Sequence, residues 1–207
     1  MENKTKKGKV ALISVFDKTG IANFAKKLQA LGWEIIATEG TGKELIKNRI
    51  SFTPALKVSK NPNKLKDCVK TISFRIETGI LFDRSDLKQV KEIEELNIKP
   101  IDIVVCNFPP LKKLVKTIKD FHVKNIDVGG PLMVRAAATN FKYVWVVVDP
   151  SDYSKVIEVL QNRKNANKFR QQLAIKAFRY TFTYDKEIVE FLKKNKIDKC
   201  LKVPKNL

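Results

Sequence analysis

Short apolar runs alternate with amphipathic segments along the first fifty residues. The run VALISV, Val10–Val15, is rich in β-branched residues and predicts a strand that is buried on both faces. The next segment has apolar residues at helical spacing, and Gly32 after it is a typical helix end. A second strand is expected at Trp33–Ala37 and a second helix from about Lys43. A strand, a glycine-containing turn and a helix, repeated twice, are typical of right-handed βα units on a parallel sheet.

The same alternation continues as far as Val148, although residues 67–81 show no clear period. The further elements expected are a short strand near Phe52, a helix at Asp83–Asn97, a strand at Ile101–Asn107, a helix at Leu111–Phe121, a strand at Tyr143–Val148, and a helix at Tyr153–Gln161 that Ser151 and Asp152 are suited to cap. The pattern from Asn165 to Lys194 is helical, and a break near Asp185 predicts two helices.

These elements predict the fold class and the domain organisation. The class is α/β, with three layers, a mostly parallel sheet with helices on both faces, and additional C-terminal helices. We expect a single domain over residues 1–207, with its core at about 9–150 and a C-terminal helical part at about 151–195.

The stretch Asn125–Asn140, NIDVGGPLMVRAAATN, combines a glycine-rich corner with the start of an Ala-rich helix. Adjacent glycines permit close approach of other groups, and Pro131 suits the first turn of a helix. The unpaired amides of that turn carry partial positive charge, so they can hold an anion or an oxyanion. Together with Asp127 and Arg135 they form a candidate site. The alternative is a helix start whose glycines serve only packing.

The turns that follow the first two strands carry a second candidate site. Ligands of open parallel sheets bind beyond the carboxyl ends of the strands, so these turns should meet at one edge with the later ones. They carry hydroxyl groups, glycines and lysines at Ser14, Lys18, Thr19, Thr38, Gly40, Thr41 and Lys43. Such groups favour a phosphorylated small molecule, with ordinary turn chemistry as the alternative. Neither a P-loop nor a GxGxxG pattern is present.

Charge and cysteine content limit the classes of function. The 207 residues carry a formal net charge of +19, but the excess is lysine spread over nearly every segment, which favours solvated faces over a nucleic-acid site. Three widely spaced cysteines and one histidine, His122, form neither a disulfide framework nor a zinc motif, so no metal or cofactor is expected. No segment has the length of a membrane span. We therefore expect a soluble cytoplasmic protein.

Several segments resemble the IMP cyclohydrolase domain of the bifunctional purine-biosynthesis protein, which has the methylglyoxal-synthase-like α/β fold. ALISVFDKTGI is similar to the family's (A/L)LISVSDKTG, IIATEGTGKEL to (I/V)(I/V)STGGTAKxL, and VKTISFRIETGIL to VKTLHPKVHGGIL. Farther along, IDIVVCNFPPL resembles IDLVVVNLYPF, and NIDVGGPLMVRAAATN resembles NIDIGGPTMVRAAAKNH. The blocks run in family order from about Val10 to Leu192. The family's second domain, an AICAR formyltransferase, is expected to be absent.

The resemblance implies closure of a purine ring. In this family the carboxamide nitrogen of formyl-AICAR ribonucleotide attacks the formyl carbon, water leaves, and IMP forms. Carried over position by position, the catalytic residues would be Lys70, Asp127, Gly129 and Gly130. The substrate and its phosphate would be bound by Ser14, Lys18, Thr38, Gly40, Thr41, Thr71, Asn107 and Arg135. Family members are dimers, so a purine ribonucleotide and a second copy of the chain are the expected partners.

Most departures from the family pattern fall on its chemical groups. The chain has Phe16 for a serine, Glu39 for a glycine, Cys68 for an arginine, Ser73-Phe74 for His-Pro, Glu77 for a histidine, Pro109 for the catalytic tyrosine and Thr139 for the catalytic lysine. Three alternatives follow. The chain is a divergent cyclohydrolase in which Lys43 or Arg75 replaces a lost group, a non-catalytic module that binds a purine nucleotide or a protein partner, or a basic nucleic-acid binder.

Overall fold

A single parallel sheet forms the centre of the protein. The structure, a computed structural model, describes residues 8–62, 71–113 and 125–194. The strands are β1 (Val10–Val15), β2 (Glu34–Ala37), β3 (Thr53–Pro54), β4 (Ile103–Asn107) and β5 (Trp145–Val147). They form one five-stranded sheet in the order β3-β2-β1-β4-β5, and each neighbouring pair is parallel.

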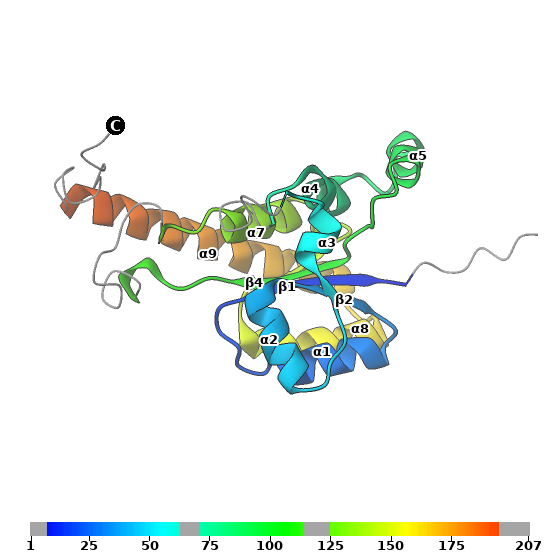
Figure 1. The fold of residues 1–207 in the computed structure, drawn as a ribbon, viewed down its shortest axis with the longest axis horizontal. Helices are drawn as coiled ribbons and strands as arrows, with labels where there is room; N and C mark the ends of the chain where they lie inside the picture. Colours follow the sequence, from blue (N-terminus) through cyan, green and yellow to red (C-terminus); the bar gives the residue numbers. More distant parts are fainter. Residues whose placement is uncertain (1–7, 63–70, 114–124, 195–207) are drawn as a thin grey trace, which may run out of the picture.

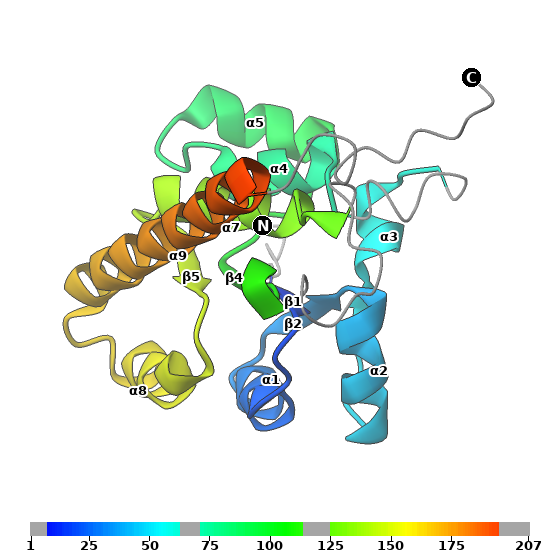
Figure 2. The same ribbon diagram turned by 90° about the vertical axis from the view of Figure 1, so that its left-hand side faces the viewer.

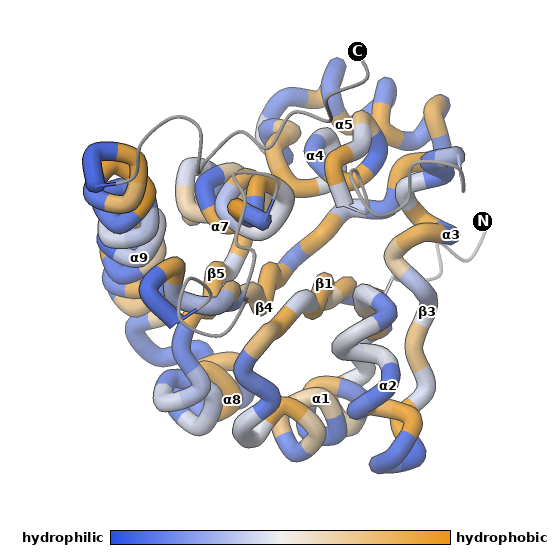
Figure 3. The backbone as a smooth tube through the Cα atoms, turned by 60° about the vertical axis from the view of Figure 1, so that its left-hand side comes forward, coloured by the Kyte–Doolittle hydropathy of each residue, from blue (hydrophilic) through white to orange (hydrophobic). Residues whose placement is uncertain are grey.

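Helices cover both faces of this sheet. They are α1 (Ile21–Ala30), α2 (Glu39–Lys47), α3 (Ala55–Ser59), α4 (Phe74–Leu81), α5 (Leu87–Glu95), α7 (Gly129–Thr139), α8 (Tyr153–Asn162) and α9 (Ala166–Lys194), with a short 3-10 turn at Pro150–Asp152. α1, α2 and α8 lie on one face, and α4, α7 and α9 lie on the other (Figures 1 and 2). Figure 3 shows the apolar strands enclosed between these two layers. The predicted three-layer α/β fold is confirmed.

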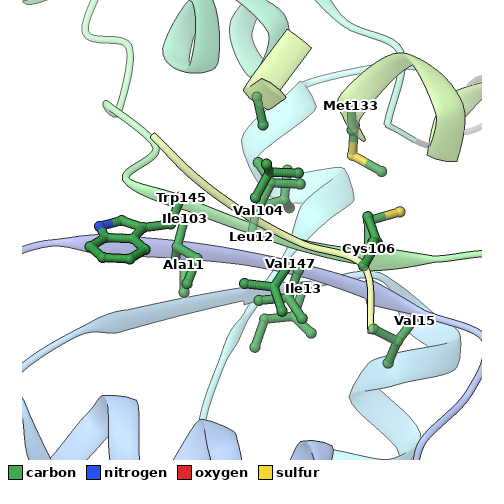
Figure 4. Packing of buried hydrophobic residues seen from close by; sticks show 14 of the residues in the cluster. Ala11, Leu12, Ile13, Val15, Ile103, Val104, Cys106, Met133, Trp145 and Val147 are labelled. Carbon is green, nitrogen blue, oxygen red and sulfur yellow. The ribbon is translucent and has the colours of Figure 1, made fainter. Parts of the chain in front are cut away.

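Strand side chains point alternately to the two helical layers, and all of β4 is buried. Leu12 and Cys106 point toward the α7 side, where Met133 meets them, whereas Ile13 and Val15 point to the other side (Figure 4). Because the strands are buried on both faces, their sequences are continuous apolar runs and do not alternate between apolar and polar residues. The alternation of side-chain directions along each strand also determines which residues at the strand ends lie on the α7 side of the sheet.

Three helices in the first half of the chain differ from the sequence expectation, and one of them, the short helix α3, follows the strand expected near Phe52. α2 begins at Glu39, four residues before the predicted Lys43, because the amide of Gly42 already donates to the carbonyl of Thr38 (2.7 Å). The glycines of this segment suggest a turn, but a Cβ at position 42 would lie only 2.4 Å from the Phe52 ring. α4 was not expected, and it is stabilised at its start by the Ser73 hydroxyl, which accepts from the Ile76 amide (3.1 Å).

The predictions for the C-terminal helices also differ from the structure. The predicted break near Asp185 is wrong, since α9 is one continuous 29-residue helix. Asp185 is exposed there, where an acidic side chain costs the helix little. Asp152 is the N-cap residue of α8, as predicted, but neither its side chain nor that of Ser151 makes a capping hydrogen bond. The Asp149 carboxylate accepts from the Ser151 amide (2.9 Å), and the Asp152 carboxylate pairs with Lys176 (2.7 Å).

One predicted helix, Leu111–Phe121, lies mostly outside the described residues. Within the described ranges, no helix combines the length and the apolar character needed to cross a bilayer.

Candidate functional site

The segments that follow β1, β2 and β4 meet at one edge of the sheet, as expected. The strand order reverses between β1 and β4, because β2 and β3 continue the sheet on one side of this pair and β5 on the other. In open parallel sheets ligands bind at such a reversal. Two cavities open at this edge, and most of the predicted site residues line one or the other.

The first cavity, which we call the α7 cavity, has a volume of about 340 Å³. It brings together four segments: the end of β1, the start of α2, the residues before α4, and the start of α7. Its lining residues are Ser14, Thr38, Glu39, Gly40, Thr71, Ile72, Asp127, Gly129, Gly130 and Met133. Seven of these residues are among those that the resemblance assigns to the site. They come from segments far apart in the sequence, and the fold brings them together at this cavity.

The two glycines at the start of α7 are required by close contacts. A Cβ at position 129 would lie 2.7 Å from Thr71 Oγ1, and one at position 130 would lie 2.6 Å from Asp127 Oδ2. The Gly130 amide donates to Asp127 Oδ1 (3.1 Å). Asp127 therefore lies against the helix start and accepts from one of its first-turn amides, as an N-terminal capping residue does. The same carboxylate lines the cavity.

Two tyrosines on α9 hold this edge in place, and the sequence analysis did not identify them. Tyr184 accepts a hydrogen bond from the Asp127 amide (2.9 Å). Tyr180 accepts from the Phe108 amide (3.1 Å) and donates to the Phe108 carbonyl (2.7 Å). Burial raises the pKa of Tyr180 to about 12 and also raises that of Tyr184. Both therefore remain protonated. Their four-residue spacing on one helix face was the only signal in the sequence.

A chain of hydroxyl groups lies between β1 and α2. The Thr38 hydroxyl donates to Ser14 Oγ (3.2 Å), and both side chains line the α7 cavity. Thr41, also predicted to bind phosphate, is fully buried and outside the cavity lining. Its Oγ1 accepts from the Val15 amide (2.9 Å). Thr41 therefore joins the start of α2 to the end of β1.

Lys18 and Asn107 line the second cavity, of about 600 Å³, which lies beside the ends of β4 and β5. The Lys18 ammonium donates to the carbonyls of Val15 and Phe16, and burial lowers its pKa. Asn107 Oδ1 accepts from the amides of Phe16 (2.8 Å) and Asp17 (2.7 Å). In this structure, therefore, both side chains bind the backbone of the β1–α1 turn.

Comparison with known proteins assigns the family. Residues 20–132, more than half of the chain, match the MGS-like domain family. The chain belongs to the MGS-like domain family. Residues 137–206 match a second family, the AICARFT/IMPCHase bienzyme. The resemblance drawn from the sequence blocks is thereby confirmed.

Individual relatives give the same result. The chain is 42% identical to the bifunctional purine biosynthesis protein PurH of Persephonella marina over 89% of its length, and 43% identical to that of Caldicellulosiruptor saccharolyticus over 92%. It spans 36% and 38% of these two proteins, little more than a third of their length. The crystal structure of ForH superposes with a TM-score of 0.77 at 31% identity, covering 89% of this chain and 98% of that one.

Two positions that the resemblance assigns to the family's site, Arg135 and Thr139, do not line the α7 cavity. Arg135 is exposed, and its guanidinium lies 5.9 Å from the centre of the Phe178 ring on α9. Thr139 is at the last residue of α7, and its hydroxyl donates to the Arg135 carbonyl (2.8 Å). The eleven residues of α7 span roughly 16 Å. Neither side chain lines the cavity that Asp127 lines.

Two of the departures from the family pattern, Phe16 and Glu39, line the cavities at this edge. Glu39 lines the α7 cavity and pairs with Lys43 (3.5 Å). Phe16 is half-exposed in the second cavity, under the Lys113 ammonium (5.5 Å). Pro109 lines neither cavity.

Glu77, on α4, has both carboxylate oxygens buried and without a hydrogen-bond partner among the described residues. This burial raises its pKa to about 7.

Some residues that the sequence analysis discussed lie outside the described residues. Lys70, Cys68 and His122 all fall in the undescribed ranges. Cys106 lies beneath the start of α7, where its thiol contacts the Gly130 carbonyl (3.8 Å) and burial raises its pKa, so it remains protonated. In the described part of the chain, no three His, Cys, Asp or Glu side chains are grouped so that they could hold a metal ion.

Proposed function

We propose that the protein closes the ring of formyl-AICAR ribonucleotide to give IMP, with the α7 cavity as its site. The observation that carries this proposal is the position of Asp127, which lies at the start of α7 in a cavity lined by hydroxyl groups and glycine backbone. Membership of the MGS-like domain family and the similarity to PurH support the choice of reaction.

The reaction requires an acceptor for a proton and donors for an oxygen. The carboxamide nitrogen forms a bond to the formyl carbon and gives up a proton, for which the Asp127 carboxylate is the acceptor. The formyl oxygen gains negative charge in this step, and the positive end of α7 stabilises it. The Gly129 amide would be its donor there, because the Gly130 amide donates to Asp127 and Pro131 has no N–H. The oxygen then takes up this proton and a second one from the former formamide nitrogen. Its bond to carbon breaks as a C=N bond forms to that nitrogen, and it leaves as water. No cofactor is needed.

The remaining groups of the cavity would orient the substrate. The hydroxyls of Ser14, Thr38 and Thr71 can each donate and accept a hydrogen bond, which suits ribose and carboxamide groups. Lys70, next to Thr71 in the sequence, would polarise the formyl group in this proposal.

A turnover assay tests the proposal. The purified protein is mixed with formyl-AICAR ribonucleotide, and IMP is followed by its purine absorbance. We expect a rate above the protein-free control, reduced by Asp127→Asn and unchanged by Glu92→Gln, which alters an exposed carboxylate on α5. A rate equal to that of the protein-free control would reject the catalytic proposal.

The second candidate function is binding of a purine nucleotide without turnover. It is favoured by the family's catalytic tyrosine and lysine positions, which are Pro109 and Thr139 here and carry neither group. IMP would then raise the melting temperature while the turnover assay gives no product.

We also propose that a second copy of the chain binds to α9. This helix exposes Ile175, Phe178, Phe182, Val189 and Leu192. Their spacing of three, four, seven and three residues is the 3.5-residue repeat of helices that pair along one face. In an antiparallel pair, Ile175 can meet Leu192 of the second copy, and Phe178 can meet Val189. Sedimentation equilibrium would detect this dimer.

A further inference from the structure

Asp127 lies in a connecting segment, so its position depends on contacts with other elements. Residues 125–128, just before α7, form no strand and no α-helix. The Asp127 amide donates to the Tyr184 hydroxyl (2.9 Å), and its Oδ1 accepts from the Gly130 amide (3.1 Å). The first bond leads to α9 and the second to α7. The carboxylate that lines the α7 cavity is therefore held between two helices.

Phe108 connects the end of β4 with the same helix start. It directly follows β4, and its side chain is buried. The centre of its ring lies 4.6 Å from that of Tyr180 and 4.7 Å from that of Tyr184. A Cβ at position 130 would lie 3.0 Å from Phe108 Cδ1, so the ring also packs against the Gly130 backbone. Phe108, Tyr180 and Tyr184, which we call the aromatic cluster, therefore support the start of α7.

Tyr180 fixes the backbone of Phe108 with a single hydroxyl group. The hydroxyl accepts from the Phe108 amide (3.1 Å) and donates to the Phe108 carbonyl (2.7 Å). Because protein interiors are closely packed, a shift of the Phe108 ring would be transmitted to Gly130. Neither Tyr180 nor Tyr184 lines the α7 cavity. They can therefore act on a ligand in that cavity through the residues that they hold.

We propose that Tyr180 and Tyr184 are positioning residues for ring closure. Tyr184 holds the backbone of Asp127, and Tyr180 holds Phe108 against the start of α7. The proposal rests on the proposed function, in which Asp127 accepts the proton. It adds α9 to the elements that the reaction needs, although the resemblance assigns no site residue to this helix. A displacement of about 1 Å at a reacting group can cost about a hundredfold in rate, so hydroxyl groups outside the cavity can affect the reaction.

A double-mutant cycle in kcat tests the proposal. Tyr180→Phe and Tyr184→Phe are each made in the wild-type protein and in Asp127→Asn, and closure of formyl-AICAR ribonucleotide is measured. In the wild-type background each change should lower kcat about tenfold and leave KM within about threefold. In the Asp127→Asn background we expect no further loss, because the base that the tyrosines position is already removed. A loss caused by unfolding alone would be the same in both backgrounds.

Tyr143→Phe is the matched control. The Tyr143 hydroxyl also makes two hydrogen bonds, with Asp83 (2.8 Å) and Ser85 (2.9 Å), but none of these three residues lines either cavity at the site. This variant should keep the kcat of its background. An unchanged kcat for Tyr180→Phe and Tyr184→Phe, or equal losses in both backgrounds, would overturn the proposal.

Hydrogen exchange of the Asp127 amide, followed by NMR, gives a readout that needs no turnover. Exchange should be faster in Tyr184→Phe, because the amide loses its acceptor, and unchanged in Tyr143→Phe. The same rate in wild-type protein and Tyr184→Phe would contradict the role of Tyr184.

The cycle also separates this proposal from the proposed function. Ring closure with equal losses in both backgrounds keeps the function and rejects the positioning role. If the wild-type protein does not close the ring, the cycle is measured in the dissociation constant of IMP. A loss of IMP affinity that disappears in Asp127→Asn then keeps the positioning of Asp127 and rejects the catalysis. If the protein neither closes the ring nor binds IMP, both fall.

Discussion

The buried carboxylate of Glu77 makes the stability of the protein depend on pH. Both of its oxygens are buried without a partner among the described residues, and burial raises its pKa from 4.5 to about 7. Between these values the folded protein retains a proton that the unfolded chain has released. The contribution of Glu77 to stability is therefore greatest on the acid side, falls as the pH rises from about 4.5 to 7, and stays lowered above 7. Glu77→Gln should remove this dependence, because glutamine stays neutral at every pH.

The size of this pH dependence follows from the shift in the pKa of Glu77. A rise from 4.5 to about 7 corresponds to roughly 3 kcal/mol of unfolding free energy without solvent screening. The side chain is only partly buried, so water reduces this contribution, and we expect about 1–2 kcal/mol.

The measurement is urea unfolding of the wild-type protein and of Glu77→Gln at pH 5 and at pH 8. The quantity to compare is the difference in unfolding free energy between the two proteins. This difference should shift in favour of the variant by about 1–2 kcal/mol between pH 5 and pH 8. Any constant cost of the glutamine amide cancels in this comparison. Glu92→Gln, at an exposed site, should give the same difference at both pH values. An unchanged difference for Glu77→Gln would refute the reasoning.

Three further predictions concern the site and the α9 surface. Gly130→Ala should destabilise the protein by about 1–3 kcal/mol in urea unfolding, because the new Cβ would lie 2.6 Å from Asp127 Oδ2; Gly40→Ala, where a Cβ meets nothing within 4 Å, should not. Tyr184→Phe should cost about 1 kcal/mol and slow ring closure, because the Asp127 amide loses its acceptor; unchanged values of both would show that this bond does not position Asp127. Phe182→Glu should shift sedimentation equilibrium from dimer to monomer, whereas the neighbouring Thr183→Glu should not.

The strands were predictable from the sequence because burial on both faces requires continuous β-branched runs. Val10–Val15 was predicted with its observed bounds. The strand predicted at Ile101–Asn107 corresponds to β4, which begins two residues later, at Ile103. Helix boundaries were less predictable where tertiary contacts decide them. Gly42 belongs to α2 because the Phe52 ring packs against it, and no local pattern shows that.

The convergence of the site segments was also predictable, but the direction of individual side chains was not. Strand order and the carboxyl-end rule place Ser14, Thr38 and Asp127 at one edge. Whether a lysine at that edge faces the ligand depends on which carbonyls its ammonium can reach. The Lys18 ammonium donates to the carbonyls of Val15 and Phe16, just before it in the chain. The tyrosines of α9 were missed for the same reason, because periodicity shows which face of a helix is buried but not what a hydroxyl on that face contacts.

The central claim is that Asp127 performs ring closure in the α7 cavity. The most direct test is the ratio of kcat/KM for wild-type protein and Asp127→Asn with formyl-AICAR ribonucleotide. Removing a general base typically costs about 10²- to 10⁴-fold, and the account predicts a loss in this range, largely in kcat. An Asp127→Asn protein that forms IMP at the wild-type rate would contradict it.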